Sequence, residues 1–350
     1  MAPAKADPET QDIEAFAHAM EHYAKRGCDK VIVQPKFMGS RAQVYLWRDV
    51  EKCYAISRKG FLIRGLDLKE AFEDLIKKTL DKDCSATIEH IIVDAELMPW
   101  ASLGGNLIED QFEAFEDVVM NELGSLCESG FYVAHKRKTE EGKEDAGTSI
   151  VVSSIDEAKF LEKFNEQVSL FGKGFDEENG DRAYFEPFNI LKMVDVEGKE
   201  YMTMHANHFN SIQLGTEFVT VNPNDWESDE NLLEFLENIK GRQLEGVVVK
   251  PAFFKWEEES QYAPYLKVRN PDYLRIVYGH DYTVPAKLER LVLKKSIGKK
   301  VGASLKDYRL GEKMLTIPTK LIDSKNEEYK ETIAQLVQSG VSQQELDPRL

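Results

Sequence analysis

The chain has 350 residues, of which 42% are hydrophobic and 31% are charged. This balance is typical of a soluble globular protein of about two domains, and it excludes collagen-like and wholly disordered classes. The net charge of −17 excludes a broadly basic surface, so a nucleic-acid partner would require a local basic patch.

The four cysteines are well separated and form no CxxC pair, which argues against a disulfide framework or a cysteine-based zinc site. No apolar run approaches the roughly 18–20 residues of a membrane span, and the first residues lack the apolar core of a signal peptide. We therefore expect an intracellular, cytoplasmic protein with no membrane partner.

Helix and strand patterns alternate in the first hundred residues. Residues 1–10 are small, polar and proline-bearing, and we expect them to be frayed. Apolar residues at helical spacing predict a helix from Ile13 to Tyr23, and a second helix is expected over 67–78. Short apolar runs separated by turn residues predict strands over 30–34, 41–47, 53–58, 61–64 and 91–98.

The region of about 105–180 has a different character. Its first part, 105–130, contains seven Asp or Glu and no Lys or Arg, and its apolar residues recur at helical spacing. We interpret the region as a largely helical insertion. Beyond it, an acidic helix is expected around Leu232–Ile239. Strands are expected over 184–191, 201–205, 246–250 and 265–268.

From about residue 281 the pattern is helical again. Between 285 and 320, ten Lys or Arg stand against three Asp or Glu, which is a local excess of positive charge. The sequence thus predicts an α+β fold. A domain of residues 1–280 carries the helical insertion at about 105–180, and a C-terminal helical module spans 281–350.

A lysine, a glycine and an arginine mark the turn between the first two predicted strands. In PKFMGSR (35–41), Lys36 ends one strand, Gly39 permits a tight turn and Arg41 opens the next strand. Both cations would point into one cleft, where the turn backbone approaches a phosphate. Alone, the motif also fits a surface hairpin with two solvated cations.

Three further segments place charged residues at strand ends or on strand faces. They are DAELMPW (94–100), EGVVVKP (245–251) and YLKVR (265–269). Period-two alternation puts the two cations of the last segment on one face of its strand. Each segment alone also fits charged strand ends at the rim of a sheet.

Taken in this order, the four segments resemble the motifs of the covalent nucleotidyltransferase superfamily, which contains the ATP-dependent ligases and the capping enzymes. KFMGSRA, ELMPW, EGVVVKP, LKVRNPDYLRIVYG and the terminal DPRL are most similar to the ligase domain of bacterial polynucleotide kinase-phosphatase (Pnkp). The resemblance extends from about residue 30 to the last residue. It departs at Gln34-Pro35, where acidic residues are expected, and neither a kinase P-loop nor a phosphatase metal cluster is present.

The resemblance implies an ATP-grasp-like nucleotidyltransferase core of antiparallel sheets and an ATP-dependent RNA ligase activity. Lys36 would attack the α-phosphorus of ATP and form a lysine–AMP bond. AMP would then pass to the 5′-phosphate of an RNA end, and a 3′-hydroxyl would displace it. Because a protonated lysine is no nucleophile, nearby cations must help Lys36 lose its proton; the candidates are Lys250, Lys267 and a divalent metal.

The resemblance also implies which residues surround the nucleotide. Glu96 and Glu245 would hold the ribose hydroxyls and an Mg²⁺ or Mn²⁺ ion. Phe188 would stack on the adenine, although plain core packing is the alternative for this residue. The expected nucleotide-binding set is Gln34, Arg41, Arg58, Glu96, Phe188, Glu245, Lys250, Lys267 and Arg269.

The basic segment near the C-terminus is the expected polynucleotide site, with a solvated helix face as the alternative. Its cations are Lys294, Lys295, Lys299, Lys300, Lys306 and Arg309. The resemblance implies RNA ends as substrates, and an RNA end-healing kinase-phosphatase or a methyltransferase as a partner protein.

Three other functions stay open at this point. A DNA nick ligase and a GTP-dependent capping guanylyltransferase would use the same chemistry on other substrates. A nucleotide-binding subunit of an RNA-repair complex that has lost catalysis would keep the fold alone.

Overall fold

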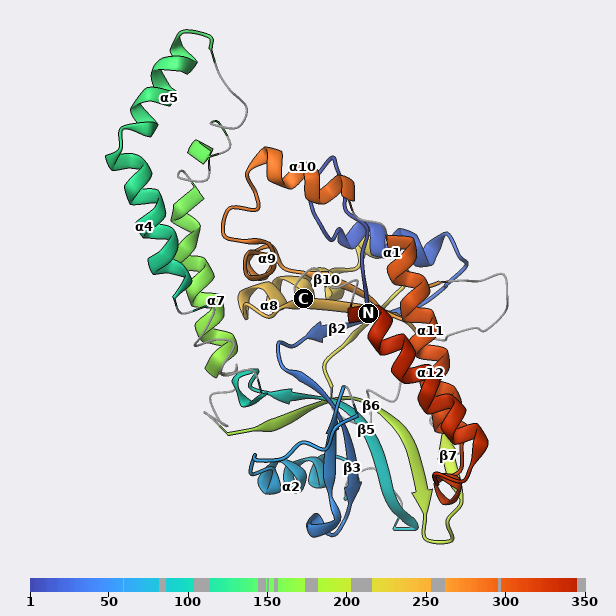
Figure 1. Ribbon diagram of the computed structural model, residues 1–350. Helices are drawn as coiled ribbons and strands as arrows, with labels where there is room; N and C mark the ends of the chain where they lie inside the picture. The colour runs from blue at the N-terminus through green and yellow to red at the C-terminus, as the bar shows by residue number, and fades with distance from the viewer. Residues whose placement is uncertain are drawn as a thin grey trace.

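The protein contains two five-stranded sheets, seen in the centre and the lower part of the computed structural model in Figure 1. Helices α4 and α5 extend away from the sheets on one side, and α11 and α12 pack on the other. The structure describes residues 1–58, 60–81, 86–103, 112, 114–143, 149, 151–153, 157–173, 182–202, 216–252, 262–294 and 297–344.

The first sheet has the strand order β1-β10-β9-β2-β8, and every pair is antiparallel except β1–β10. Its strands are β1 (Ala2–Pro3), β2 (Val31–Lys36), β8 (Val219–Val221), β9 (Gly246–Pro251) and β10 (Leu266–Arg269). The expected strands 30–34, 246–250 and 265–268 are confirmed. Strand β8 was not predicted, since three residues are too few for a periodic pattern.

The expectation that residues 1–10 are frayed is wrong. Ala2 and Ala4 are fully buried, and the backbone N–H of Ala4 donates to the carbonyl of Lys267 over 2.9 Å. Small side chains let this segment lie flat against the edge of β10, so the composition that suggested disorder serves close packing here.

The second sheet has the order β4-β3-β5-β6-β7, and all its pairs are antiparallel. Its strands are β3 (Ser40–Trp47), β4 (Tyr54–Ser57), β5 (Ile88–Met98), β6 (Tyr184–Asp195) and β7 (Glu200–Met202). The expected hairpin after β4 is present, with a bridge between Ile56 and Leu62. Of the strand expected over 201–205, residues 203–205 lie outside the described residues.

Each sheet buries one face under helices. On the first sheet, α1 (Phe16–Ala24) and α8 (Glu230–Gly241) cover a core that includes Val33 and Val249. The Tyr23 hydroxyl fixes α1 by donating to the carbonyls of Val249 and Ala263, at 3.1 and 3.0 Å. On the second sheet, α2 (Lys69–Lys78) inserts Phe72 and Leu75 into a separate core.

The predicted helical insertion is confirmed in the described part of 105–180. It contains α4 (Phe115–Glu128), α5 (Phe131–Glu140) and α7 (Leu161–Lys173). Helix α7 packs on α9 (Pro271–Tyr278), where Phe164 and Ile276 share a small core. Figure 1 shows α4 and α5 as an arm that leads away from both sheets. The described residues also contain short 3-10 helices, at Val50–Lys52, Glu157–Phe160, Trp226–Ser228 and Thr319–Leu321.

The C-terminal helices are α10 (Pro285–Lys294), α11 (Ile297–Thr316) and α12 (Glu327–Gln344). Val301 and Leu305 of α11 pack against the core of the first sheet. A buried lysine joins the end of α11 to the second sheet: Lys192 donates to the carbonyl of Ile317 over 3.1 Å and pairs with Glu200 at 2.5 Å. Among the described residues, no helix combines the length and apolar character that a membrane crossing requires.

Four aromatic side chains form a ring stack on the second sheet, defined here as Tyr45, Trp47, Tyr54 and His90. The rings of Tyr45 and Tyr54 lie 4.5 Å apart, and those of Trp47 and His90 lie 4.6 Å apart. Tyr45 and Trp47 alternate with Val44 and Leu46, which are buried against α2. The ring stack therefore lies on the sheet face opposite α2, the same face as Arg41.

Candidate active site

The face of the first sheet opposite α1 and α8 carries the sequence-predicted residues of three strands. Alternation in β2 puts Gln34 and Lys36 on one face, since Val31 and Val33 point into the core. The register pairs Lys36 with Gly246 and Val248 with Lys267. This face, the first site face, presents Gln34, Lys36, Lys250, Lys267 and Arg269.

The second sheet contributes the remaining predicted charges from its face opposite α2. Arg41 lies opposite Glu96 in the register of β3 and β5. Arg58 directly follows Ser57, which pairs with Ala42, so it lies beside Arg41 at the end of the β3–β4 ladder. The turn around Gly39 joins the two sheets, and this is why residues far apart in sequence meet at Lys36.

Lys36 forms an ion pair with Glu245, with 2.6 Å between its Nζ and Oε2 of the glutamate. The Glu245 side chain is only 4% exposed. Its backbone carbonyl accepts from the N–H of Asn270 at 2.8 Å, which fixes it at the end of β10. Gly246 follows with φ of +148°, and a Cβ there would lie 2.1 Å from the Val268 carbonyl oxygen. The close approach of β9 and β10 thus requires glycine.

Glu96 lies close to two other carboxylates, those of Glu245 and Asp94. Its pKa is raised to about 7, chiefly by burial and also by the carboxylates of Glu245 and Asp94, while Lys36 and Arg41 oppose the shift. Gly39 packs directly on it, since a Cβ at Gly39 would lie 2.7 Å from Cγ of Glu96.

A divalent cation fits this donor set. Carboxylate oxygens are the ligands that Mg²⁺ and Mn²⁺ prefer, and a cation would relieve the carboxylate crowding that raises the Glu96 pKa. Within the described residues no group of three or more His, Cys, Asp or Glu side chains has metal-binding geometry. Glu96 and Glu245 would therefore hold an ion that keeps water or phosphate oxygens as its other ligands.

Two lysines on the first site face have lowered pKa values. The pKa of Lys267 is lowered to about 7, chiefly by burial and also by the charges of Arg269 and Lys36, while Glu14 and Glu245 oppose the shift. Burial likewise lowers the pKa of Lys250 to about 8, where Asp94 opposes the shift and Arg41 adds to it. Both ammonium groups would gain stability from a bound polyphosphate, because it supplies the missing negative charge.

Arg269 is held by Glu14, a residue that sequence reasoning missed. The Glu14 carboxylate accepts from Nη2 of Arg269 at 2.6 Å, from Nε at 3.0 and 3.1 Å, and from the backbone N–H at 3.0 Å. Both side chains are almost inaccessible, at 0% and 6% exposure. Because the pair spans 255 positions, no local pattern in the sequence could have revealed it. The expected contact of Arg269 with the nucleotide stays a prediction.

Asp94 is a second residue without an expected role. Its carboxylate accepts two hydrogen bonds from Arg41, at 2.9 and 3.2 Å, and its charge raises the pKa of Arg41 above the usual range. A bidentate pair of this kind fixes the plane of the guanidinium. Asp94 therefore orients Arg41, and its position two residues before Glu96 is the local signal for it.

Aromatic rings surround Lys250. Its Nζ lies 5.6 Å from the ring centre of Phe188 and 6.0 Å from that of Tyr265. Phe188 also stacks on Phe37 at 6.5 Å and packs partly on the core. Tyr308 of α11 contacts Tyr265 edge to face at 5.5 Å, so the C-terminal module reaches the site.

The predicted polynucleotide cations fall into three groups. Lys299, Lys306 and Arg309 are exposed on α11, whereas Lys300 is half-buried. Lys295 and the side chain of Lys294 lie outside the described residues. These positions place part of the basic segment on the helix that also contacts Tyr265.

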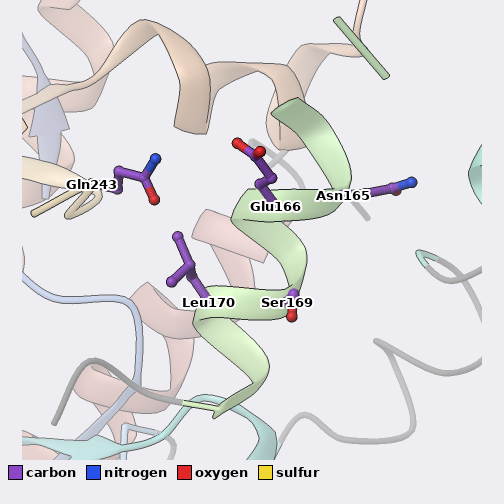
Figure 2. Close-up of a pocket in the computed structure, with 5 residues that line it drawn as sticks. All are labelled: Asn165, Glu166, Ser169, Leu170 and Gln243. Atoms are coloured by element: carbon purple, nitrogen blue, oxygen red, sulfur yellow. The ribbon is translucent and has the colours of Figure 1, made fainter. Parts of the chain in front are cut away.

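A separate pocket of about 510 Å³ opens between α7 and the turn before Glu245. Figure 2 shows Gln243 facing Glu166 and Leu170 across it, and Asn165 pointing away. The remaining lining residue is Ser169. None of the five is a sequence-predicted site residue, so this pocket is distinct from the site around Lys36.

The sequence profile of the PNKP adenylyltransferase domain, a ligase domain, matches residues 1–321. The chain belongs to this family. A comparison with curated proteins finds no significant match. The family assignment agrees with the placement of Lys36, Glu96, Glu245 and Lys267 around one site, and it makes the fold a nucleotidyltransferase fold.

Two solved structures show the same fold over the whole chain. A chain of the Pnkp1/Rnl/Hen1 complex superposes with a TM-score of 0.83 at 24% identity, covering 100% of this chain and 94% of that one. A chain of the Pnkp1/Rnl/Hen1 RNA repair complex gives a TM-score of 0.78 at 25% identity with the same coverage. The inserted and C-terminal helices are therefore within the matched fold.

Proposed function

We propose that this protein is an ATP-dependent RNA ligase that works through a covalent Lys36–AMP intermediate. The observation that carries the proposal is the Lys36–Glu245 pair at 2.6 Å, set beside Glu96 and Lys267 in a chain of the PNKP ligase-domain family. A partly buried amine among carboxylates and cations suits attack on a phosphate.

In the first step, Nζ of Lys36 attacks the α-phosphorus of ATP. A P–N bond forms, the bond from phosphorus to the pyrophosphate oxygen breaks, and pyrophosphate leaves. Lys250 and Lys267 neutralise charge on the phosphate as the transition state develops. Glu245 holds Lys36 in position, and Arg41, oriented by Asp94, contacts the ribose or the phosphates.

Two further groups bind the nucleotide and the metal. Phe188, beside Lys250, stacks on the adenine, and Gln34 on β2 reads its edge. Glu96 and Glu245 hold Mg²⁺ or Mn²⁺, which when bound supplies positive charge at the phosphate oxygens.

In the second step, an oxygen of the 5′-phosphate of an RNA end attacks the phosphorus of Lys36–AMP. A P–O–P bond forms, the P–N bond breaks, and the Lys36 amine leaves and takes up a proton. In the third step, the 3′-hydroxyl of the other end loses its proton and attacks the phosphorus of the 5′-phosphate, a phosphodiester bond forms, and AMP leaves with the bonding electron pair. Arg41 on β3 and Arg58, which directly follows β4, hold the 5′-phosphate.

We also propose that the protein works in an RNA-repair assembly. Support comes from the similarity to chains of the Pnkp1/Rnl/Hen1 RNA repair complex. A kinase-phosphatase that prepares RNA ends, or a methyltransferase, would be the partner.

The decisive experiment is intact mass measurement after incubation with ATP and Mg²⁺. We expect a gain of one AMP that is lost in acid, as a P–N bond requires, and no gain in Lys36→Ala. Lys250→Ala serves as a comparison, because it keeps the nucleophile and lowers only the rate. Absence of the adduct in the wild-type protein would refute the proposal and favour a nucleotide-binding subunit without catalysis.

Substrate choice separates the remaining alternatives. Labelled GTP that modifies Lys36 in place of ATP would indicate a capping guanylyltransferase. Sealing of a nicked DNA duplex in preference to 5′-phosphorylated RNA would indicate a DNA ligase.

A further inference from the structure

Helix α11 presents three faces, and two of them are occupied. One packs on the core of the first sheet through Val301, Leu305 and Tyr308. Another faces α12, where Oδ1 of Asp307 accepts a hydrogen bond from the Ser339 hydroxyl at 2.6 Å. Figure 1 shows the two helices side by side. The third face points to solvent.

The third face carries charge of one sign. At about 100° per residue, four cations fall within an arc of about 80°. We define these as the α11 cation face: Lys299, Lys306, Arg309 and Lys313. The two acidic residues of α11 lie outside this arc, since Asp307 engages Ser339 and Glu312 acts electrostatically on Tyr265.

Some surface lysines of the chain are paired with acidic residues, whereas within the described residues the lysines of this face are not. Lys25, Lys69 and Lys330 each form an ion pair with a nearby glutamate. In the described part of the chain, no ion pair includes a lysine of the α11 cation face. Three neighbouring lysines without an ion-pair partner among the described residues, in a chain of net charge −17, suit a polyanion, which the rest of the surface repels.

The side of α11 that packs on the first sheet reaches the site at the turn that carries Arg309. Tyr308, the neighbour of Arg309, contacts Tyr265 at 5.5 Å, and Tyr265 lies beside Lys250. Lys299 lies 14 positions before Lys313 on α11, a distance of about 21 Å at 1.5 Å per residue. The α11 cation face therefore leads away from the site over the length of several nucleotides of single strand.

We propose that the α11 cation face binds the sugar–phosphate backbone of single-stranded RNA whose 5′-phosphate end lies at the site. Arg309 and Lys313 contact nucleotides next to that end, and Lys299 contacts nucleotides farther along the strand. This inference rests on the proposed function. It differs from the expectation from sequence in two residues. It adds Lys313, and it leaves out Lys300, which lies about 100° from Lys299 around the helix.

The test is the affinity of 5′-phosphorylated RNA for single alanine variants, measured by fluorescence anisotropy. Two lengths are used, about four and about twenty nucleotides. Lys313→Ala weakens binding of both, whereas Lys299→Ala weakens binding of the long RNA only. For the long RNA, each variant lowers the slope of log affinity against log salt by about 0.7, the value for one lost single-strand phosphate contact. Lys300→Ala is the matched control on the same helix and leaves both affinities unchanged.

Two results would overturn the inference. One is an equal loss for Lys300→Ala and Lys306→Ala, which would show that overall charge and not the face matters. The other is a loss for Lys299→Ala that is the same at both lengths. Thermal unfolding of each variant identifies a folding defect. Wild-type adenylylation on Lys36, measured separately, reports on the proposed function, so each failure is recognised by its own assay.

Discussion

At the scale of single residues, the site depends on the ion pair of Arg269 with Glu14, a residue outside the sequence motifs. Glu14 accepts four hydrogen bonds from the side chain and backbone of Arg269. It thereby fixes the strand that carries Lys267, and its charge opposes the lowering of the Lys267 pKa. A residue before the first helix thus sets the electrostatics beside Lys36.

Glu14→Gln removes the charge that compensates buried Arg269. We expect the free energy of unfolding to fall by about 3 kcal/mol, as for other broken buried pairs. The pKa of Lys267 should fall below about 7, because one of the two carboxylates that oppose its lowering is lost and only Glu245 remains. The measurements are urea unfolding and the pH profile of Lys36 adenylylation, whose Lys267-dependent limb should shift to lower pH. Glu21→Gln, in an exposed pair with Lys25, is the control, and equal effects of both variants would contradict the prediction.

Glu96 gives the protein a pH-dependent stability of known sign. Its pKa rises from 4.5 in the unfolded chain to about 7 in the folded one, so the folded state binds the proton more tightly. This contribution is complete below pH 4.5 and is lost as the pH rises through 7. The loss amounts to at most about 3 kcal/mol, at 1.36 kcal/mol for each pKa unit.

Glu96→Gln should therefore flatten the profile of unfolding free energy between pH 4.5 and 7. Urea titrations of both proteins across this range measure the difference, and parallel profiles would contradict it. Added Mg²⁺ should stabilise the wild-type protein more at pH 8 than at pH 5, because the carboxylate must be ionised to bind the ion.

At the scale of elements, local sequence patterns predicted the helices and strands whose formation depends on residues close together in the sequence. The strands that carry Lys36, Glu96, Glu245 and Lys267 were predicted because each has an apolar run that ends in a glycine, proline or charge. The prediction that these residues share one site came from the family resemblance and not from the spacing of apolar residues. β8 and the Glu14–Arg269 pair escaped prediction because tertiary contacts alone create them.

Gly246 permits the contact between β9 and β10. Gly246→Ala would place a methyl group 2.1 Å from the Val268 carbonyl oxygen at a φ of +148°. We expect a loss of about 3 kcal/mol or more of unfolding free energy, together with loss of adenylylation, since Glu245 precedes it. Gly241→Ala is the matched control. Nothing lies within 4 Å of a Cβ there, and Gly241 ends α8, so stability should rise by about 0.5 kcal/mol. Calorimetry on both variants distinguishes the two sites.

At the scale of the whole molecule, the C-terminal helical module contacts both sheets, by apolar packing on the first and by hydrogen bonds on the second. Val301 and Leu305 bury apolar surface on the first sheet. On the second, Glu200 accepts from the N–H of Thr319 at 2.6 Å and pairs with Lys192. Because α11 also carries the proposed RNA face, its docking sets where a strand would enter the site. The division at residue 280 stays a prediction.

Lys192→Met tests this fastening. The variant keeps the volume but leaves Glu200 without its cation and Ile317 without its donor. We expect a loss of about 3 kcal/mol and earlier proteolytic cleavage around residues 317–321. Limited proteolysis followed by mass spectrometry measures the second effect. Lys330→Met, in an exposed pair with Glu327, should leave the digestion pattern unchanged, and cleavage at the same rate in both variants would exclude a fastening role for Lys192.

The ring stack gives the protein an optical reporter. Trp47 lies 4.6 Å from the imidazole of His90, and a protonated imidazole quenches indole fluorescence. Burial lowers the pKa of His90, so the emission of Trp47 should dim only in more acidic solution than it would beside an exposed histidine. Subtracting the spectrum of Trp47→Phe isolates this one of the four tryptophans. Burial raises the pKa of Tyr45 in the same stack to about 12, and Tyr329 of α12 contributes to this shift, which places the start of the terminal helix near the optical reporter.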